Sequence, residues 1–276
     1  MSYKTILVHI DSGKHCPARV EVAARLASQH DAHLIGLHAP TSVEPPKDIR
    51  IKGWQAIIES QKRDDVMQAA LAETAFNKAV AVANPTSAEW RSSLKNAAEA
   101  VSLHARYADL LVLGQRDPAE DYGLEHDFVE RVALSCGRPA LVIPYAGRFV
   151  TIGKRILVAW DRGREATRAL TDAIPLLRLA DEVKVIAISP KEDGHGALPG
   201  ADIGLYLARH GVNIEVKAEY GEVLDVGNEL LSRAADFGTD LIVMGAYGHS
   251  RLRELIMGGA TRTIIDSMTV PVLLSH

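Results

Sequence analysis

Four glycines near the end of the chain have a spacing that suits a phosphate-binding loop. They lie in the segment GAYGHSRLRELIMGGAT, which follows the apolar run DLIVM. Glycine costs about 0.5–1 kcal/mol relative to alanine inside regular structure, so glycines here favour a sharp turn or the close approach of another group. The pattern G-x2-G-x9-G-G, formed by Gly245, Gly248, Gly258 and Gly259, also opens a helical segment whose first N–H groups attract anions. The sequence therefore predicts an anion site.

Polar side chains near these glycines fit the same chemistry. Thr261 would add a hydroxyl, and Arg251, Arg253 and Arg262 would add positive charge. Asp161 follows the apolar run RILVAW and is better suited to hydrogen-bonding a base or a ribose. Neither the Walker pattern G-x-x-x-x-G-K-[ST] nor the dinucleotide pattern G-x-G-x-x-G is present, and the glycine spacing alone fits an ordinary strand exit as well. The prediction thus depends on the fold bringing Asp161 to the glycines.

The chain contains two copies of one unit. KTILVHIDSGKHCPARVEVAARLA recurs as KRILVAWDRGREATRALTDAIPLL, with Asp11 and Asp161 in register, and ADLLVLG ending at Gly114 recurs as TDLIVMG ending at Gly245. The offsets between the copies, 161 − 11 = 150 and 245 − 114 = 131, differ by 19 residues. The first copy therefore has an insertion, and its spacing of apolar residues predicts one long amphipathic helix over residues 52–82.

The rest of each copy alternates short apolar runs with helical patterns. The runs are rich in β-branched residues and nearly continuous, which is typical of strands buried on both faces. Five such strands separated by helices predict a doubly wound parallel α/β fold in each of two domains, residues 1–147 and 153–276. Ligands of such sheets bind at the carboxyl ends of the strands, where the strand order reverses. Asp161 ends the first strand of the second copy and Gly245 ends its fourth, so both would face one crevice if these strands are neighbours.

The composition is that of an ordinary globular protein. The chain has 276 residues, 47% hydrophobic and 24% charged, with a formal net charge of −4. No cluster of Lys and Arg offers a surface for nucleic acid, and no window approaches the roughly 18 apolar residues of a membrane span. The two cysteines, Cys16 and Cys136, lack metal-ligand spacing and fit a reducing compartment. We therefore expect a cytoplasmic protein that binds neither nucleic acid nor membrane and has no metal site built from side chains.

The chain resembles the universal stress protein family in its tandem, two-domain form. The segments ILVAWDRGREATRAL, GADIGLYLARHGVNIEV and GAYGHSRLRELIMGGATRTIIDSMTVPVLLSH carry the resemblance, which covers the whole chain. It implies Rossmann-like five-stranded units of strand order 3-2-1-4-5, paired through their last strands. In one branch of the family it also implies ATP bound by the motif G-x2-G-x9-G-[S/T/N]. The nucleotide contacts it implies are Asp161 to adenine or ribose, the Ile188 backbone to adenine, and Gly245, Gly248, Gly258, Gly259 and Ala260 to ribose and phosphates.

Two departures from the family motif bear on this expectation. Gly259 stands where the family has Ser, Thr or Asn, so a hydroxyl is lost and we expect weaker or differently placed phosphate contacts, with Thr261 as a substitute. In the first copy Asp117 stands in place of Gly248, and Asp127 in place of Gly259. We expect Asp127 to cap the helix that it precedes, and we expect acidic repulsion to exclude ATP from the first copy.

The resemblance and the residues together leave three functions open. The leading one is a stress-response regulator in which ATP, with or without Mg²⁺, binds the second copy and changes a conformation or the binding of an unknown protein partner. The alternative is a slow ATPase or phosphotransferase that uses the same pocket, although no convincing catalytic base is present. The third is a scaffold that binds no nucleotide. Both a monomer with its own copies paired and a homodimer remain open.

Overall fold

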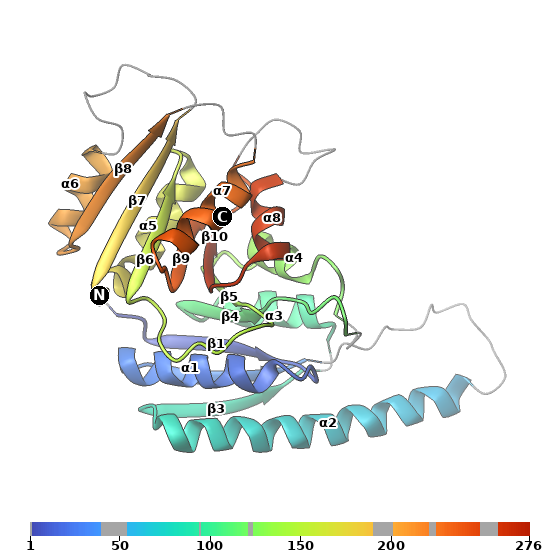
Figure 1. Cartoon of the computed structure of the whole chain (residues 1–276). Coiled ribbons are helices and arrows are strands. Elements are labelled where there is room, and N and C mark those ends of the chain that lie inside the picture. The colour runs from blue at the N-terminus through green and yellow to red at the C-terminus, as the bar shows by residue number, and fades with distance from the viewer. Residues whose placement is uncertain are drawn as a thin grey trace. The chain divides into compact units, whose positions relative to one another are not determined.

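The computed structural model describes residues 2–39, 54–93, 95–120, 124–189, 201–220, 225–248 and 259–276 (Figure 1). Strands and helices alternate along these ranges. In the first copy they are β1 (Thr5–Ile10), α1 (Cys16–His30), β2 (His33–His38), α2 (Trp54–Ala83), β3 (Ser87–Ser92), α3 (Ala97–Ala105), β4 (Leu110–Gly114), α4 (Phe128–Ser135) and β5 (Ala140–Ile143). In the second they are β6 (Arg155–Trp160), α5 (Arg164–Leu177), β7 (Glu182–Ser189), α6 (Ala201–Arg209), β8 (Ile214–Tyr220), α7 (Val226–Asp236), β9 (Leu241–Gly245), α8 (Gly259–Ser267) and β10 (Val272–Ser275).

Both copies have the same strand order. It is β3-β2-β1-β4-β5 in the first copy and β8-β7-β6-β9-β10 in the second. Contacts divide the chain into compact units of residues 3–136 and, in the main, 137–276, so that β5 lies in the second unit. There it pairs antiparallel with β10, with Leu141 opposite Leu273. The predicted doubly wound α/β fold, the 3-2-1-4-5 order and the pairing of the last strands are thus confirmed.

The strand order reverses at the first strand of each copy. β1 pairs in parallel with β2 on one side and β4 on the other, and β6 pairs in the same way with β7 and β9. The inner strands, such as β4 and β9, are buried because helices pack against the sheet and against each other, α1 on α2, α3 on α4 and α7 on α8. The carboxyl ends of β1 with β4, and of β6 with β9, are therefore the two places where a doubly wound sheet forms a crevice.

The insertion of the first copy forms the long helix that its periodicity predicts. α2 has 30 residues, about 45 Å of helix, and Figure 1 shows it running past the end of the much shorter β3. Its Phe76 is 1% exposed and packs against the backbone of Gly36 in β2, where a Cβ would stand 2.6 Å from the ring. Gly36 therefore lets the aromatic ring approach the strand closely.

An aspartate ties the beginnings of neighbouring strands together in both copies. Asp109 precedes β4 and accepts hydrogen bonds from the backbone N–H groups of Lys4 and Thr5, at 2.7 and 3.0 Å. Asp240 precedes β9 and accepts from the N–H groups of Gly153, Lys154 and Arg155, at 2.9–3.1 Å. This aspartate clamp aligns the first and fourth strands of each copy.

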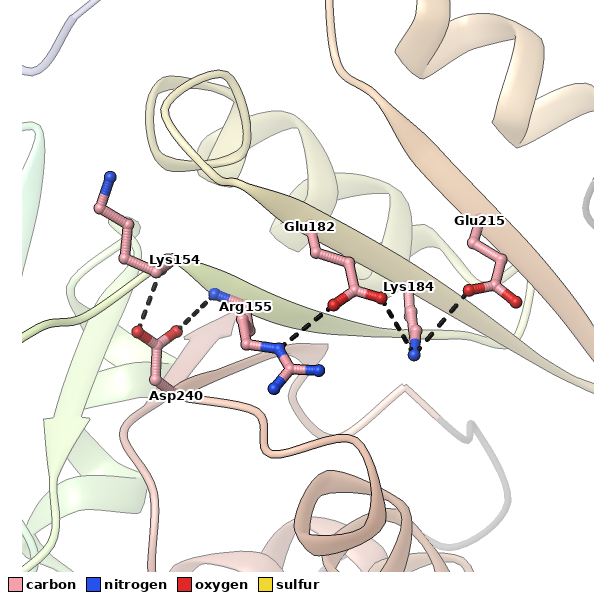
Figure 2. Close-up of polar contacts among 6 residues, drawn as sticks. All are labelled: Lys154, Arg155, Glu182, Lys184, Glu215 and Asp240. Atoms are coloured by element: carbon pink, nitrogen blue, oxygen red, sulfur yellow. Dashed lines mark hydrogen bonds and ion pairs between the residues drawn. The ribbon is translucent and has the colours of Figure 1, made fainter.

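The second copy continues its clamp with a ladder of charges across β6, β7 and β8. Figure 2 shows Arg155 pairing with Glu182, and Lys184 bridging Glu182 and Glu215. These residues lie at the amino ends of the strands, the opposite end from the crevice. The ladder therefore belongs to the framework of the sheet rather than to the candidate site.

Candidate functional site

The structure places Asp161, Ile188 and Gly245 of the second copy at the carboxyl ends of neighbouring strands. Val158 of β6 pairs with Val243 of β9, so Asp161 and Gly245 leave neighbouring strands at the same end. Trp160 pairs with Ala187 of β7, which places Ile188 and Asp161 each one residue beyond that pair. We call the surroundings of Asp161, Gly245, Gly248 and Thr261 the C-terminal crevice.

Asp161 forms a tight turn at the start of the crevice. Its Oδ1 accepts a hydrogen bond from the N–H of Gly163 at 2.7 Å, two residues on, and Gly163 caps α5 with extended backbone. Arg162 between them has a left-handed φ of 63°. The aspartate residue is exposed, so its carboxylate has capacity left to accept from a ligand hydroxyl or amino group.

Gly245 permits the first turn of α5 to touch the end of β9. A Cβ on Gly245 would stand 2.5 Å from the backbone nitrogen of Ala166 and 2.9 Å from the Cβ of Glu165. A Cβ on Gly248 would stand 2.9 Å from Oε2 of Glu165. The group that approaches these two glycines most closely is therefore part of the protein itself, the first turn of α5.

The beginning of α8 completes the C-terminal crevice. Tyr247 has a left-handed φ of 60°, and its N–H donates to Oγ1 of Thr261 at 3.3 Å. Thr261 is buried, and by accepting this hydrogen bond its hydroxyl links Tyr247 to α8. The hydroxyl still has one proton to donate. Gly259 is exposed and Ala260 half-buried, and no described atom lies within 4 Å of a Cβ placed on Gly259.

A second helix holds α8 in place. A Cβ on Gly227, in the first turn of α7, would stand 2.7 Å from Thr263 and 3.1 Å from the carbonyl oxygen of Ala260. The missing side chain thus allows α7 to pack closely against the first turn of α8. Arg262 lies on that turn with its Nε 3.7 Å from Asp266. Of the other predicted residues, Gly258, Arg251 and Arg253 lie outside the described part of the chain.

Glu165 is a residue of the crevice that the sequence did not reveal. It is 8% exposed, and its Oε1 lies 3.2 Å from the exposed guanidinium of Arg164. A carboxylate in the first turn of a helix also interacts favourably with the helix dipole. The repeat contained a signal, because the offset of 150 residues places Glu165 opposite His15 of the first copy.

In the first copy the protein's own side chains fill the equivalent crevice. The guanidinium of Arg19 lies against Gly114, where a Cβ would overlap it. Its Nη2 donates to Oδ2 of Asp11 at 2.7 Å, and its Nε donates to the carbonyl oxygen of His9 at 2.9 Å. Burial disfavours the charged carboxylate of Asp11, but the guanidinium outweighs it and holds the pKa of Asp11 below its ordinary value. The second copy has Ala169 where the first has Arg19.

A second group of charged side chains in the first copy forms ion pairs around Asp117. Nε2 of His15 lies 3.0 Å from Oδ2 of Asp117, and Lys14 pairs with both Asp117 and Glu120. The N–H of Ala119, and then His15 and Lys14, lower the pKa of Asp117. Asp117 is therefore paired with Lys14 and His15, so its charge is partly neutralised within the protein.

The expectation that Asp127 caps α4 is wrong. Asp127 occupies the N-cap position, but its side chain makes no capping hydrogen bond, because its backbone has φ −102° and ψ 19° rather than the extended geometry that favours capping. Its backbone carbonyl still accepts from the N–H of Arg131 at 2.8 Å. The helix therefore begins without the carboxylate cap that the sequence suggested.

His9 is a buried histidine beside Asp11 in the first copy. Its ring is fully buried, packs against Phe128 at 4.9 Å between centroids, and has Nδ1 3.8 Å from Oδ2 of Asp11. Neither ring nitrogen has a hydrogen-bond partner among the described residues. Burial is the largest cause that lowers the pKa of His9, to about 3, so the ring is neutral at pH 7.

Three further features of the described residues concern metal ligands, membrane-crossing helices and a cysteine thiol. Within them, no three His, Cys, Asp or Glu side chains gather as metal ligands would. Over the same residues, no helix combines the length and apolar character that a membrane crossing requires. Cys16 lies at the start of α1, but burial raises the pKa of its thiol.

Comparisons with known proteins agree with this architecture. The model of the universal stress protein family matches residues 2–144 and 153–276. A universal stress protein of Synechocystis is 28% identical over 171 residues, 60% of this chain and 57% of that relative, so the match spans little more than half of the relative's length. A universal stress protein of Methanocaldococcus jannaschii is 37% identical over 46 residues, 17% of this chain and 28% of its own.

A solved structure shows the same fold over nearly the whole chain. It is a universal stress protein of Archaeoglobus fulgidus, 17% identical, with a TM-score of 0.74 over 98% of this chain and 95% of its own. Another member of the family has been solved in complex with cAMP; it is 21% identical, with a TM-score of 0.36 over 53% of this chain and all of its own. The family model covers both copies, and the chain belongs to the universal stress protein family, with two domains in tandem.

Proposed function

We propose that this chain is a nucleotide-binding regulator in which the C-terminal crevice binds ATP and the first copy binds none. The observation that carries the proposal is the contrast between the copies at equivalent positions. Arg19 lies against Gly114 in the first copy, whereas the second has Ala169 at the position of Arg19 and, at the start of α8, Gly259 with no described atom within 4 Å of a Cβ placed on it. The proposal thus assigns one nucleotide to each chain.

The residues of the crevice fit the parts of an adenine nucleotide. The carboxylate of Asp161 accepts from a ribose hydroxyl or an adenine amino group, and the backbone of Ile188 stands beside it for the base. The N–H groups that open α8, together with the hydroxyl of Thr261, face the phosphates, where the positive end of the helix dipole favours negative charge. ATP binding would act on this protein by favouring one conformation over another, and thereby the binding of a protein partner.

The first test is to identify what the purified protein carries. The protein is denatured, any released nucleotide is identified by chromatography, and the nucleotide-free protein is titrated with ATP and Mg²⁺ by calorimetry. Binding at one site per chain supports the proposal, whereas neither released nucleotide nor binding heat contradicts it. Phosphate release measured in the same sample separates a regulator, which leaves ATP intact, from a slow ATPase.

A further inference from the structure

Three large apolar side chains are exposed on the outer side of α3 and α4 in the first copy. Leu103 of α3 is 38% exposed, Tyr107 just beyond its end is 75% exposed, and Leu134 of α4 is 40% exposed. We propose that this surface, which we call the α3–α4 face, joins two copies of this chain in a weak, symmetric dimer. The proposal does not depend on nucleotide binding in the C-terminal crevice.

The apolar side chains of the face lie next to one another. α3 and α4 each follow a strand of the same parallel sheet, so the two helices run in the same direction. They touch where Oγ of Ser102 lies 2.7 Å from Oγ of Ser135. Leu103 follows the first serine and Leu134 precedes the second, so each is turned by about 100° from the contact, to the same solvent side. Tyr107 lies one helical turn after Leu103 and extends this surface.

The second copy shows that the fold does not require apolar side chains at these positions. Its α7 corresponds to α3, and aligning their N-cap residues gives an offset of 225 − 96 = 129. At this offset buried residues of the two helices coincide: Ala98 with Gly227, Val101 with Leu230, and Ala105 with Ala234. The prolines before the last strands give 271 − 139 = 132 for α4 and α8.

Exposed polar residues stand at all three positions in the second copy. They are Ser232 for Leu103, Asp236 for Tyr107 and Asp266 for Leu134. Two copies of one fold thus differ in that only the first presents a contiguous apolar surface here. Such a surface on a folded protein marks an interaction site more often than a single exposed leucine does.

The charges that flank Leu103 fit a second copy of the same face. Glu99 lies four residues before Leu103 and Arg106 three residues after it, and both are exposed. When two copies of α3 cross antiparallel about a two-fold axis beside Leu103, Glu99 of each copy comes opposite Arg106 of the other. Glu99 also pairs with Lys95 on its own helix, but both side chains are more than half exposed, so this pair contributes little and exchanges readily. A symmetric contact therefore joins the apolar side chains and two pairs of opposite charge.

The size of the face predicts a weak association. α3 has 9 residues and α4 has 8, which is about 12–14 Å of helix each. Two helices of this length cover less than the roughly 800 Å² per partner of a standard interface, so the contact belongs to the small, transient class. We therefore expect reversible dimers with a dissociation constant of about 10–100 μM.

Sedimentation velocity of the nucleotide-free full chain over a range of about 5–500 μM tests the proposal, because this range spans the expected dissociation constant. Leu134→Asp gives the face a residue that the second copy has at the same position, so the fold should tolerate it. The matched control is Leu205→Ser, since Leu205 is 54% exposed on α6 of the second copy, away from the face. Glu99→Arg, Arg106→Glu and the double variant test the antiparallel pairing.

We expect the parent and Leu205→Ser to associate equally, and Leu134→Asp to associate at least tenfold more weakly. Each single charge variant should weaken association about three- to tenfold by placing like charges together, and the double variant should restore it. A parent that stays monomeric throughout would overturn the proposal and leave the face to a different protein. A dimer that Leu134→Asp leaves unchanged would also overturn it, and equal weakening in the single and double charge variants would overturn the antiparallel pairing. Leu103→Ser replaces Leu134→Asp if that variant does not fold.

Discussion

The guanidinium of Arg19 lies against the backbone of Gly114, at the carboxyl end of β4, and pairs there with the buried carboxylate of Asp11. This contact distinguishes the two copies at the carboxyl ends of their first and fourth strands, although the aspartate and the glycine there are the same in both. The first copy supplies its own cation to its own aspartate, whereas in the second copy Ala169 leaves Asp161 exposed to solvent. The same fold therefore places a guanidinium beside the aspartate in one copy and leaves the aspartate of the other copy exposed.

Removing Arg19 should strongly destabilise the protein. In Arg19→Ala the carboxylate of Asp11 would stay buried without its cation, and such a loss costs about 3–5 kcal/mol of unfolding free energy. Arg25→Ala is the control, because Arg25 lies on the same helix, is 42% exposed at its side chain, and pairs with Glu21 at 4.0 Å; it should change stability by about 0.5 kcal/mol or less. Urea denaturation measures both, and equal effects would argue against a special role for Arg19.

The aspartate clamp at the other end of the sheet gives a second stability prediction. Asp240→Ala leaves three backbone N–H groups without their acceptor, and we expect a loss of about 1–3 kcal/mol. Asp181→Ala removes a carboxylate from the same surface, where it forms one exposed ion pair, and should change little. Thermal unfolding compares the two variants. Similar melting temperatures would show that the clamp does not contribute to stability.

His9 should make stability depend on pH. Burial lowers its pKa from 6.5 to about 3, so between these values the unfolded chain binds a proton that the folded chain does not. The free energy of unfolding should therefore fall as the pH drops from 6.5 towards 3. His9→Leu removes this proton and should flatten the slope between pH 4 and pH 6.5, measured by urea denaturation at several pH values. His30, whose pKa is lowered to about 4, retains part of the slope; an unchanged slope would show that His9 is not the group responsible.

Sequence reasoning predicted the elements and the end of the strands at which Asp161 and Gly245 lie. The apolar runs predicted the strands, the spacing around Phe76 predicted α2, and the resemblance supplied the strand order. It did not reveal the contacts of Arg19 with Gly114 or of Glu165 with Gly248, because these join residues that periodicity does not relate. Even so, aligning the copies places Arg19 opposite Ala169, and a charge present in only one copy is a signal that the sequence contains.

The contacts made by Gly245 and by Asp127 also lay beyond the sequence. Gly245 was expected to contact the ribose and phosphates, which stays a prediction, and the structure adds that the first turn of α5 lies against it. Asp127 was expected to cap α4, but its backbone geometry prevents this. In both cases the residue type indicated a special position correctly, while the partner depended on tertiary packing.

Gly259 offers a direct way to alter the proposed phosphate contacts without disturbing the fold. No described atom lies within 4 Å of a Cβ placed there, so a side chain is accommodated. Gly259→Ser restores the hydroxyl of the family motif and should tighten ATP binding about two- to tenfold, the value of one added hydrogen bond. Calorimetry measures the change, with the melting temperature as a check on folding. Weaker binding in Gly259→Ser would show that phosphates do not lie at this position.

The measurement that tests the central claim most directly is the stoichiometry of ATP binding in Mg²⁺, for the parent chain and for Gly259→Asp. Aspartate suits a helix N-terminus, so the variant should fold, but its charge would occupy the proposed anion site. We predict one ATP per chain for the parent and none for the variant. Two per chain, or undiminished binding by Gly259→Asp, would contradict the assignment of a single site to the C-terminal crevice.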